Sequence, residues 1–315
     1  MVCVSGAGGA STAYVYLPDV LVVQADEDLD AWLDAAWAER VDGSTTAFTL
    51  QADLGVQPSD WPEPGDKQSL KRVDKLIKVM GHHWKKLDKQ CDPDAVFALM
   101  YLLTTMAVYH HTAGEYFDDN DYLADITVTF ATLYFDAYDA WHEGDPADAP
   151  LPWQEAFAWA ESGESSITED QFLGMNAHIH YDLGVSIAAH GTHDPETGEW
   201  RKPDMDRINH VLAWVADDVQ WWIAYYYGPD APEGEPPAWG NDVRDEDWAV
   251  LEPITAWREQ AWVNGETIEA TSDMDDRGAY DTWMQEHSWT VAQGFQSPKT
   301  EPTAPARTSY CQAHG

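Results

Sequence analysis

Apolar side chains recur at every third or fourth position through most of this 315-residue chain, and this spacing constrains its fold more than any other feature. Such a period places them along one face of an α-helix. In residues 66–90 the apolar positions are Leu70, Val73, Ile77, Met80, Trp84 and Leu87. The same period predicts helices over residues 26–41, 92–112, 120–142, 152–161, 168–190, 203–227, 247–262 and 277–291. We therefore expect an all-α fold, a single-domain bundle of about eight or nine helices.

The two ends of the chain lack the helical pattern. Residues 1–24 are rich in Gly, Ala and Ser and then apolar, so we expect an irregular N-terminal arm, with at most a short strand at residues 13–17. Residues 293–315 are polar and carry prolines, which is typical of a disordered tail. The helical domain should then span residues 25–292.

Two smaller signals concern helix boundaries. Thr168 with Gln171 three residues later predicts a capping box at the start of a helix. Proline and glycine are frequent in residues 43–65 and 228–245, which we expect to be loops.

The charge balance is strongly acidic. The chain has 56 Asp and Glu residues against 17 Lys and Arg, a formal net charge of -39. In dilute buffer such charges repel one another, whereas molar salt shortens the screening length to about 3 Å. The acidic residues are spread along the whole chain, which favours adaptation to a salt-rich, haloarchaeal cytoplasm over an acidic tract that binds a partner. Nucleic acid is not an expected partner, because phosphate binding needs a basic surface.

One segment departs from this acidic balance. Residues 67–89 contain eight of the 17 basic side chains. One interpretation is a docking face for an anionic partner. We favour the other, in which the segment complements the acidic remainder of the protein, because salt would screen an exposed long-range attraction.

The cysteines and the apolar segments bear on location. Cys3, Cys91 and Cys311 are odd in number and widely spaced, which argues against a disulfide framework or a Cys-rich zinc site. There is no apolar run of about 18 residues, so neither a membrane span nor a membrane partner is expected. The N-terminal apolar stretch is interrupted by Asp19 and has no preceding basic residue, unlike a signal peptide. The expected location is the cytoplasm.

The segment 174–183, Gly-Met-Asn-Ala-His-Ile-His-Tyr-Asp-Leu, concentrates polar groups within an apolar helix. His178 and Asp182 are four residues apart and share a helix face. At this spacing the two side chains can chelate a divalent ion, or the carboxylate can fix the histidine tautomer. Asn176 and His180 form a second such pair on an adjoining face. The alternative to a functional site is a buried hydrogen-bond network that fixes helix packing.

Further candidates lie on neighbouring predicted helices. His111 and Glu115 are four residues apart at a helix end, a spacing similar to the His/carboxylate pairs of zinc-dependent helical hydrolases of the phospholipase C type. A histidine at a helix end also commonly satisfies terminal carbonyls. Asp136 is the acid on its helix best placed to point inward, and Asp218 is expected to be partly buried with a perturbed pKa.

Residues 93–227 resemble an uncharacterised protein family, a domain of unknown function found in actinobacteria and haloarchaea. The resemblance rests first on the motif Gly-(Met/Ile)-Asn-Ala-His-Ile-x-x-Asp-Leu, which residues 174–183 match. Upstream elements occur in the same order, namely Ala98-Leu-Met-Tyr101 with Thr104 or Thr105, then Gly114 with Phe117 and Asp118, then Phe130-Ala-x-x-Tyr134. The resemblance implies an all-helical domain and no particular activity.

The leading functional hypothesis is a metal-dependent, hydrolase-like helical protein that holds one divalent ion, Zn, Mn or Fe, in a central cavity. The metal-ligand candidates are His178, Asp182, His111, Glu115 and Asp218, and the catalytic candidates are Asn176, His180 and Asp136. An unidentified small molecule is the expected partner. The alternative is a non-catalytic binding or scaffold module whose His/Asn/Asp network is structural. A pocket with further His or carboxylate groups within about 5 Å of the His/Asp pair would favour the metal site.

Overall fold

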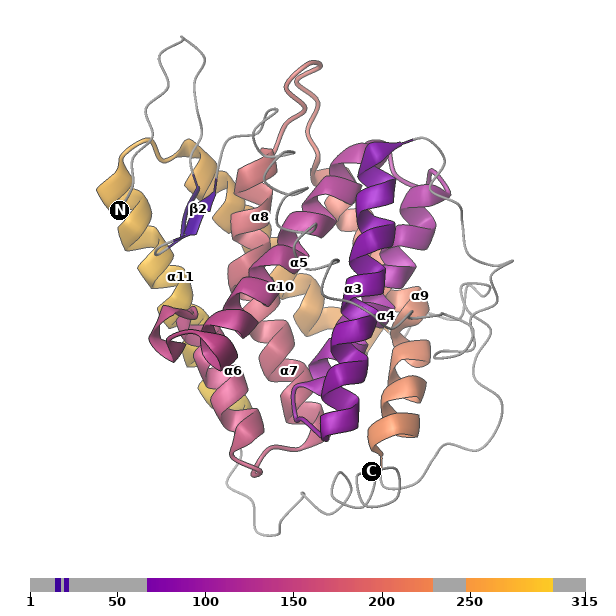
Figure 1. Ribbon diagram of the computed structural model, residues 1–315. Helices are drawn as coiled ribbons and strands as arrows, with labels where there is room; N and C mark the ends of the chain where they lie inside the picture. Colours follow the sequence, from indigo (N-terminus) through magenta and orange to yellow (C-terminus); the bar gives the residue numbers. More distant parts are fainter. Residues whose placement is uncertain (1–14, 18–19, 23–66, 229–247, 297–315) are drawn as a thin grey trace.

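The computed structural model describes residues 15–17, 20–22, 67–228 and 248–296. Within these ranges nine α-helices form a bundle beside a small antiparallel hairpin of β1 (Val15–Leu17) and β2 (Val20–Val22) (Figure 1). The helices are α3 (Gln68–Gln90), α4 (Ala95–Ala113), α5 (Asn120–Glu143), α6 (Leu151–Glu161), α7 (Ile167–Ala177), α8 (Leu183–His190), α9 (Lys202–Tyr227), α10 (Trp248–Ala270) and α11 (Met274–Phe295). The predicted all-α bundle is confirmed.

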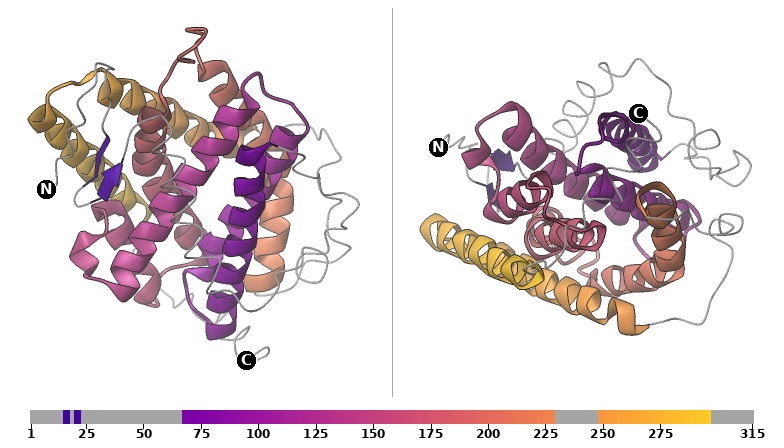
Figure 2. Two further views of the ribbon diagram at one scale, coloured as in Figure 1. Left: turned by 45° about the horizontal axis from the view of Figure 1, so that its top comes forward. Right: turned by 90° about the horizontal axis from the view of Figure 1, so that it is seen from below.

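Helix α4 is the central element of the bundle. Its side chains are apolar nearly all round, and it packs against α3, α5, α7 and α9. A helix without a polar face is stable only when other elements cover it on all sides. Seen from below, α10 and α11 close one side of the bundle (Figure 2).

Helices α8 and α10 approach each other closely through glycines. A Cβ atom at Gly184 would lie 2.8 Å from the Cβ of Asn264, and a Cβ at Gly265 would overlap Ile187. The missing side chains let the two backbones come together. Helix α10 therefore continues eight residues beyond its predicted end at Trp262, because packing against α8 offsets the low helix propensity of Gly265.

Helix α7 begins two residues earlier than a Thr168 cap would give. Ser166 is its N-cap: the Ser166 hydroxyl accepts the Glu169 backbone N–H, and the Glu169 carboxylate accepts the Ser166 backbone N–H. The predicted capping box of Thr168 and Gln171 is wrong. Serine followed by a charged Glu satisfies two of the free N–H groups at the helix start, and this pair sets the boundary.

Several predicted segments lie outside the described residues. These are the helix at 26–41, the loop at 43–65, nearly all of the loop at 228–245, most of the N-terminal arm and the tail after residue 296. Strand β1 falls within the candidate strand at 13–17. Helix α11 passes the predicted domain end at 292 by about one turn.

Two further observations concern the cysteines and membrane spans. Cys91 is disulfide-bonded, which the odd cysteine count did not predict. None of the described helices combines the length and the apolar character that a membrane span requires.

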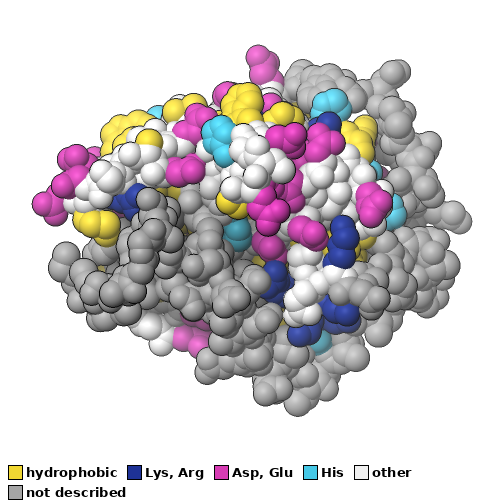
Figure 3. Space-filling view, turned by 90° about the horizontal axis from the view of Figure 1, so that it is seen from above, with side chains coloured by type: hydrophobic (Ala, Val, Ile, Leu, Met, Phe, Trp, Pro, Cys, Tyr) yellow, Lys and Arg dark blue, Asp and Glu magenta, His cyan; other side chains and the backbone are white. Residues whose placement is uncertain are grey.

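The Lys-rich segment 67–89 forms α3, and several of its cations meet carboxylates of the same chain. An Arg72 guanidinium nitrogen lies 2.5 Å from an Asp125 oxygen of α5, and Lys67 Nζ lies 3.9 Å from an Asp121 oxygen of the same helix. These ion pairs agree with a segment that complements the acidic body. Viewed from above, Asp and Glu are spread over the described surface, whereas Lys and Arg gather in a few places (Figure 3).

Candidate functional site

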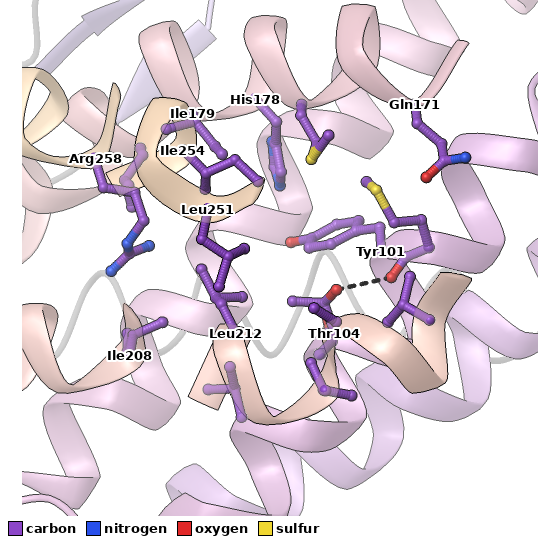
Figure 4. A pocket seen from close by; sticks show the side chains of 18 of the residues that line it. Tyr101, Thr104, Gln171, His178, Ile179, Ile208, Leu212, Leu251, Ile254 and Arg258 are labelled. Carbon is purple, nitrogen blue, oxygen red and sulfur yellow. Dashed lines mark hydrogen bonds between the residues drawn. The ribbon is translucent and has the colours of Figure 1, made fainter. Parts of the chain in front are cut away.

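A cavity of 290 Å³ lies between α4, α5, α7, α9 and α10 (Figure 4). Its wall is mostly apolar and includes Met100, Phe130, Met175, Ile208, Leu212 and Ile254. The polar side chains that line it are Tyr101, Thr104, Thr105, Thr127, Thr168, Gln171, His178, Gln220 and Arg258. A concave apolar space with a few placed polar groups is the usual form of a small-molecule site.

A π-helical turn carries the predicted His/Asp motif. It comprises residues His178–Asp182 and joins α7 to α8. The backbone N–H of Leu183 donates to the carbonyl of His178, five residues back instead of four. Single π turns are rare and occur frequently at functional sites. No feature of the sequence spacing distinguished this turn from ordinary α-helix.

His178 is held on the cavity wall by three neighbours. Its Nδ1 lies 2.8 Å from Asp182 Oδ2, and the same oxygen accepts a hydrogen bond of 2.8 Å from Trp153 Nε1. The imidazole stacks on Phe130 with the ring centres 3.4 Å apart, and the Tyr101 ring lies edge-on to it at 4.5 Å. The side chain is 4% exposed. The predicted His178–Asp182 pair therefore exists as a buried, oriented dyad.

Burial determines the charge state of this dyad. Burial lowers the pKa of His178 well below 6.5. Burial raises the pKa of Asp182 well above 3.8; the Trp153 hydrogen bond opposes this shift and the nearby charge of Asp136 adds to it. Both shifts favour the uncharged form of each group. With the acid proton on Oδ2, Asp182 donates to Nδ1 and the ring proton lies on Nε2; with the acid proton on Oδ1, Nδ1 donates and Nε2 is an acceptor.

Two polar atoms beside the cavity have no hydrogen-bond partner within the described part of the chain. They are His178 Nε2 and the Tyr101 hydroxyl oxygen, and both are buried. Burial raises the pKa of Tyr101 well above 10. The nearby Thr105 hydroxyl offsets part of this shift, although it does not form a hydrogen bond of normal geometry with the Tyr101 hydroxyl. Both groups are therefore uncharged; the Tyr101 hydroxyl can donate, and Nε2 donates when it carries the ring proton. Figure 4 shows the His178 ring pointing into the cavity from the α7 side, above Tyr101.

The second predicted pair lies away from the cavity. His180 Nδ1 lies 2.6 Å from Asn176 Oδ1, and Asn176 Nδ2 donates to the Ser288 carbonyl at 2.8 Å. Asn264 Nδ2 donates to the His180 carbonyl at 3.3 Å. Burial and the neighbouring His287 lower the pKa of His180 to about 4. This pair ties α7 and the π turn to α10 and α11, as the alternative of a structural network expects.

The remaining predicted ligands do not converge on the dyad. His111 packs against Trp214 near the end of α4, and burial lowers its pKa to about 4. It lies ten residues beyond Tyr101, or roughly 15 Å along the helix. Glu115 is exposed, and Asp218 is buried on α9 but does not line the cavity. Across the described residues no group of three His, Cys, Asp or Glu side chains is placed to hold a metal ion.

Sequence reasoning missed Arg258 and the role of Tyr101. Tyr101 stands in the family motif, but its buried hydroxyl follows from the packing of α4 against the π turn. Arg258 is on α10, about 80 residues further along the chain than His178, and no local pattern marks it. Its position on the cavity wall arises from the contact of α10 with α9 and the π turn.

The fold and the site define an all-helical protein with an apolar cavity at the middle of its bundle and a buried His/Asp dyad in the cavity wall. The chain belongs to the family of unknown function DUF5995, whose sequence model matches residues 73–298. The predicted membership of an uncharacterised all-helical family is thereby confirmed. No curated protein and no solved structure shows significant similarity to the chain.

Proposed function

We propose that the protein binds a small, largely apolar molecule in the cavity and holds it by a hydrogen bond from His178 Nε2. The observation that carries this proposal is the buried Nε2 atom, which has no partner in the described part of the chain and lines an apolar space. A buried polar group left unpaired costs about 1–3 kcal/mol. A bound molecule with an acceptor atom would remove that cost.

The cavity and the dyad narrow the class of molecule. A volume of 290 Å³ is about twice that of an engineered apolar cavity that accepts benzene, so a ligand of about 12 non-hydrogen atoms would fit. With the ring proton on Nε2, the ligand should offer an acceptor such as a carbonyl or ether oxygen. The mostly apolar wall favours an alkyl or aryl body.

Of the two predicted functions, this proposal is closer to the binding module. The metal-dependent hydrolase stays a prediction: with three His, Cys, Asp or Glu ligands, an ion at His178 would need at least one of them from outside the described ranges, and it would need an unprotonated Nε2. Metal analysis of protein purified without a His-tag tests it. Less than about a tenth of an equivalent of Zn, Mn or Fe, with no stabilisation when these ions are added, would end the hypothesis.

The binding proposal is tested with a matched pair of probes, benzylacetone and butylbenzene, which share an aryl body and differ in one carbonyl oxygen. Their affinities are measured by calorimetry in concentrated KCl for the wild-type protein and for His178→Phe. The substitution keeps a flat ring and removes the donor. We expect the ketone to lose about tenfold in affinity and the hydrocarbon to change by less than twofold.

His180→Phe is the matched control. It changes a second buried histidine, also paired four residues away, that does not line the cavity. It should leave the affinities for both probes close to wild type. The proposal would be refuted if neither probe binds the wild-type protein. It would also be refuted if ketone binding falls equally in His178→Phe and His180→Phe.

A further inference from the structure

Arg258 brings a positive charge to one end of the apolar cavity. The residue lines the cavity from α10, and Figure 4 shows its guanidinium group directed towards α9 beside Ile208. Among the described residues that line the cavity, Arg258 is the only Lys or Arg. A charge at the wall of an apolar space is costly unless an opposite charge or several hydrogen bonds compensate it.

The hydrogen bonds of Arg258 compensate its charge only in part. Its Nε donates to Asn209 Oδ1 at 2.7 Å, and its Nη2 donates to the Met205 carbonyl at 2.7 Å. Both acceptors are neutral. Within the described ranges no carboxylate forms an ion pair with this guanidinium: Asp206, which acts on it electrostatically, pairs with Lys202 at 2.7 Å.

The geometry of the guanidinium indicates which anion fits. Two of its five N–H groups bind α9 along one edge, which leaves the edge formed by Nη1 and the second Nη2 hydrogen. Two parallel N–H groups match the two oxygens of a carboxylate. A phosphate dianion would keep an uncompensated negative charge beside an apolar wall with a single cation.

The net negative charge of the protein makes a local cation necessary for binding an anion. A chain with a net charge of -39 repels anions at long range. An anion that nevertheless binds needs a local cation shielded from competing salt, and a site beside an apolar cavity supplies that shielding. The alternative is that Arg258 only joins α10 to α9 through its two neutral acceptors.

We propose that Arg258 binds the carboxylate of the molecule that fills the cavity, so that the ligand class is a small carboxylic acid with an apolar body. This inference rests on the proposed function, because it uses the same cavity. The carboxylate lies at the α10 end, and the alkyl or aryl body extends over the apolar wall towards His178.

The test compares phenylbutyrate with phenylbutanol, which differ only in the charged end group. Affinities are measured in concentrated KCl for the wild-type protein, for Arg258→Met, which keeps the length of the side chain, and for Arg258→Lys. We expect phenylbutyrate to lose about tenfold or more in Arg258→Met and less in Arg258→Lys, which keeps the charge but not the fork. Phenylbutanol should change by less than twofold.

Arg207→Met is the control for loss of a cation, since Arg207 on α9 pairs with Asp118 and Asp204 and does not line the cavity. It should leave the affinity for phenylbutyrate near wild type. A measurement that needs no variant follows the carboxyl carbon of labelled phenylbutyrate by NMR during a pH titration. Pairing with Arg258 should lower the pKa of the bound acid below that of the free acid.

The outcomes separate the two proposals. The carboxylate assignment is overturned if both probes bind and Arg258→Met weakens them equally, or if the pKa of the bound acid is not lowered. Arg258 is then only a structural link between α10 and α9, and the cavity proposal stands. If neither phenylbutyrate nor phenylbutanol binds the wild-type protein, the cavity proposal fails as well. Loss restricted to the carboxylate in Arg258→Met, with Arg207→Met unchanged, supports the assignment.

Discussion

Replacing Asp182 by Asn should cost little stability, although Asp182 is buried and doubly hydrogen-bonded. In the folded protein its carboxyl accepts from Trp153 and pairs with His178 Nδ1, each at 2.8 Å. If the carboxyl is uncharged, as its raised pKa indicates, an amide has nearly the same shape, and its oxygen in the place of Oδ2 can accept from both Trp153 Nε1 and a protonated His178 Nδ1. We expect Asp182→Asn to lower the free energy of unfolding by less than about 1 kcal/mol.

Asp182→Ala supplies the comparison at the same position. It removes both hydrogen bonds and leaves the Trp153 N–H and the His178 Nδ1 buried without partners. Each unpaired group costs about 1–3 kcal/mol, and the lost volume adds to this. The alanine variant should therefore be less stable than wild type by about 2–5 kcal/mol.

The pH dependence of stability gives a second test of whether Asp182 is protonated in the folded protein. Above about pH 3.9 the unfolded state loses the Asp182 proton that the folded state keeps, so the free energy of unfolding falls by about 1.4 kcal/mol per pH unit up to the folded pKa. His178 acts in the opposite sense, because its lowered pKa makes stability rise with pH up to about 6.5. The two contributions oppose each other below about pH 6.5, the unfolded pKa of histidine, and only the Asp182 contribution applies between that pH and its folded pKa.

Urea unfolding in concentrated KCl, repeated from about pH 5 to about pH 8.5, measures both effects. Relative to wild type, Asp182→Asn should gain stability as the pH rises. Two results would refute the reasoning. One is an asparagine variant as unstable as the alanine variant. The other is a stability difference between wild type and Asp182→Asn that does not change with pH. Either would show that the buried carboxyl is ionised and that His178 Nε2 is an acceptor instead of a donor.

Three further predictions concern packing, a second histidine and salt. Gly174→Ala should lower the free energy of unfolding by about 1–3 kcal/mol in a urea titration, because a Cβ would overlap the Phe97 ring. Gly278→Ala on α11 has open space around the new Cβ and should raise the free energy of unfolding by up to about 1 kcal/mol. Asp94→Asn should lower the pKa of His142 in an NMR titration, since the Asp94 carboxyl, 2.9 Å from His142 Nε2, opposes the effect of burial and raises that pKa. The melting temperature should rise steeply with KCl up to about 1 M, because salt screens the repulsion within a chain of net charge -39, and a salt-independent melting temperature would contradict the halophilic interpretation.

Most of the helical fold could be predicted because helix formation depends on short-range spacing. The apolar stripe of residues 66–90 became α3 within two residues, and the helix predicted over residues 92–112 became α4. The errors occurred where another interaction competed with local spacing. Ser166 and Glu169 displaced the expected cap, and the packing of Gly265 against α8 extended α10.

The candidate site was predictable only along one helix. Spacing alone paired His178 with Asp182 and Asn176 with His180, and both hydrogen bonds exist. Spacing did not show which pair lines a cavity. Nor did it indicate Trp153, which binds Asp182 from a helix nearly thirty residues away in the chain.

The sequence by itself determined the helices, the acidic surface and the two side-chain pairs, since each depends on residues within a few positions of one another or on composition. Only the tertiary structure decided that His178 lines an apolar cavity and that Arg258 lies at one end of this cavity. The cavity is the volume that five helices leave unfilled, and its wall joins residues that are distant in the chain. That volume depends on how closely the helices approach, which the side chains of all five set together.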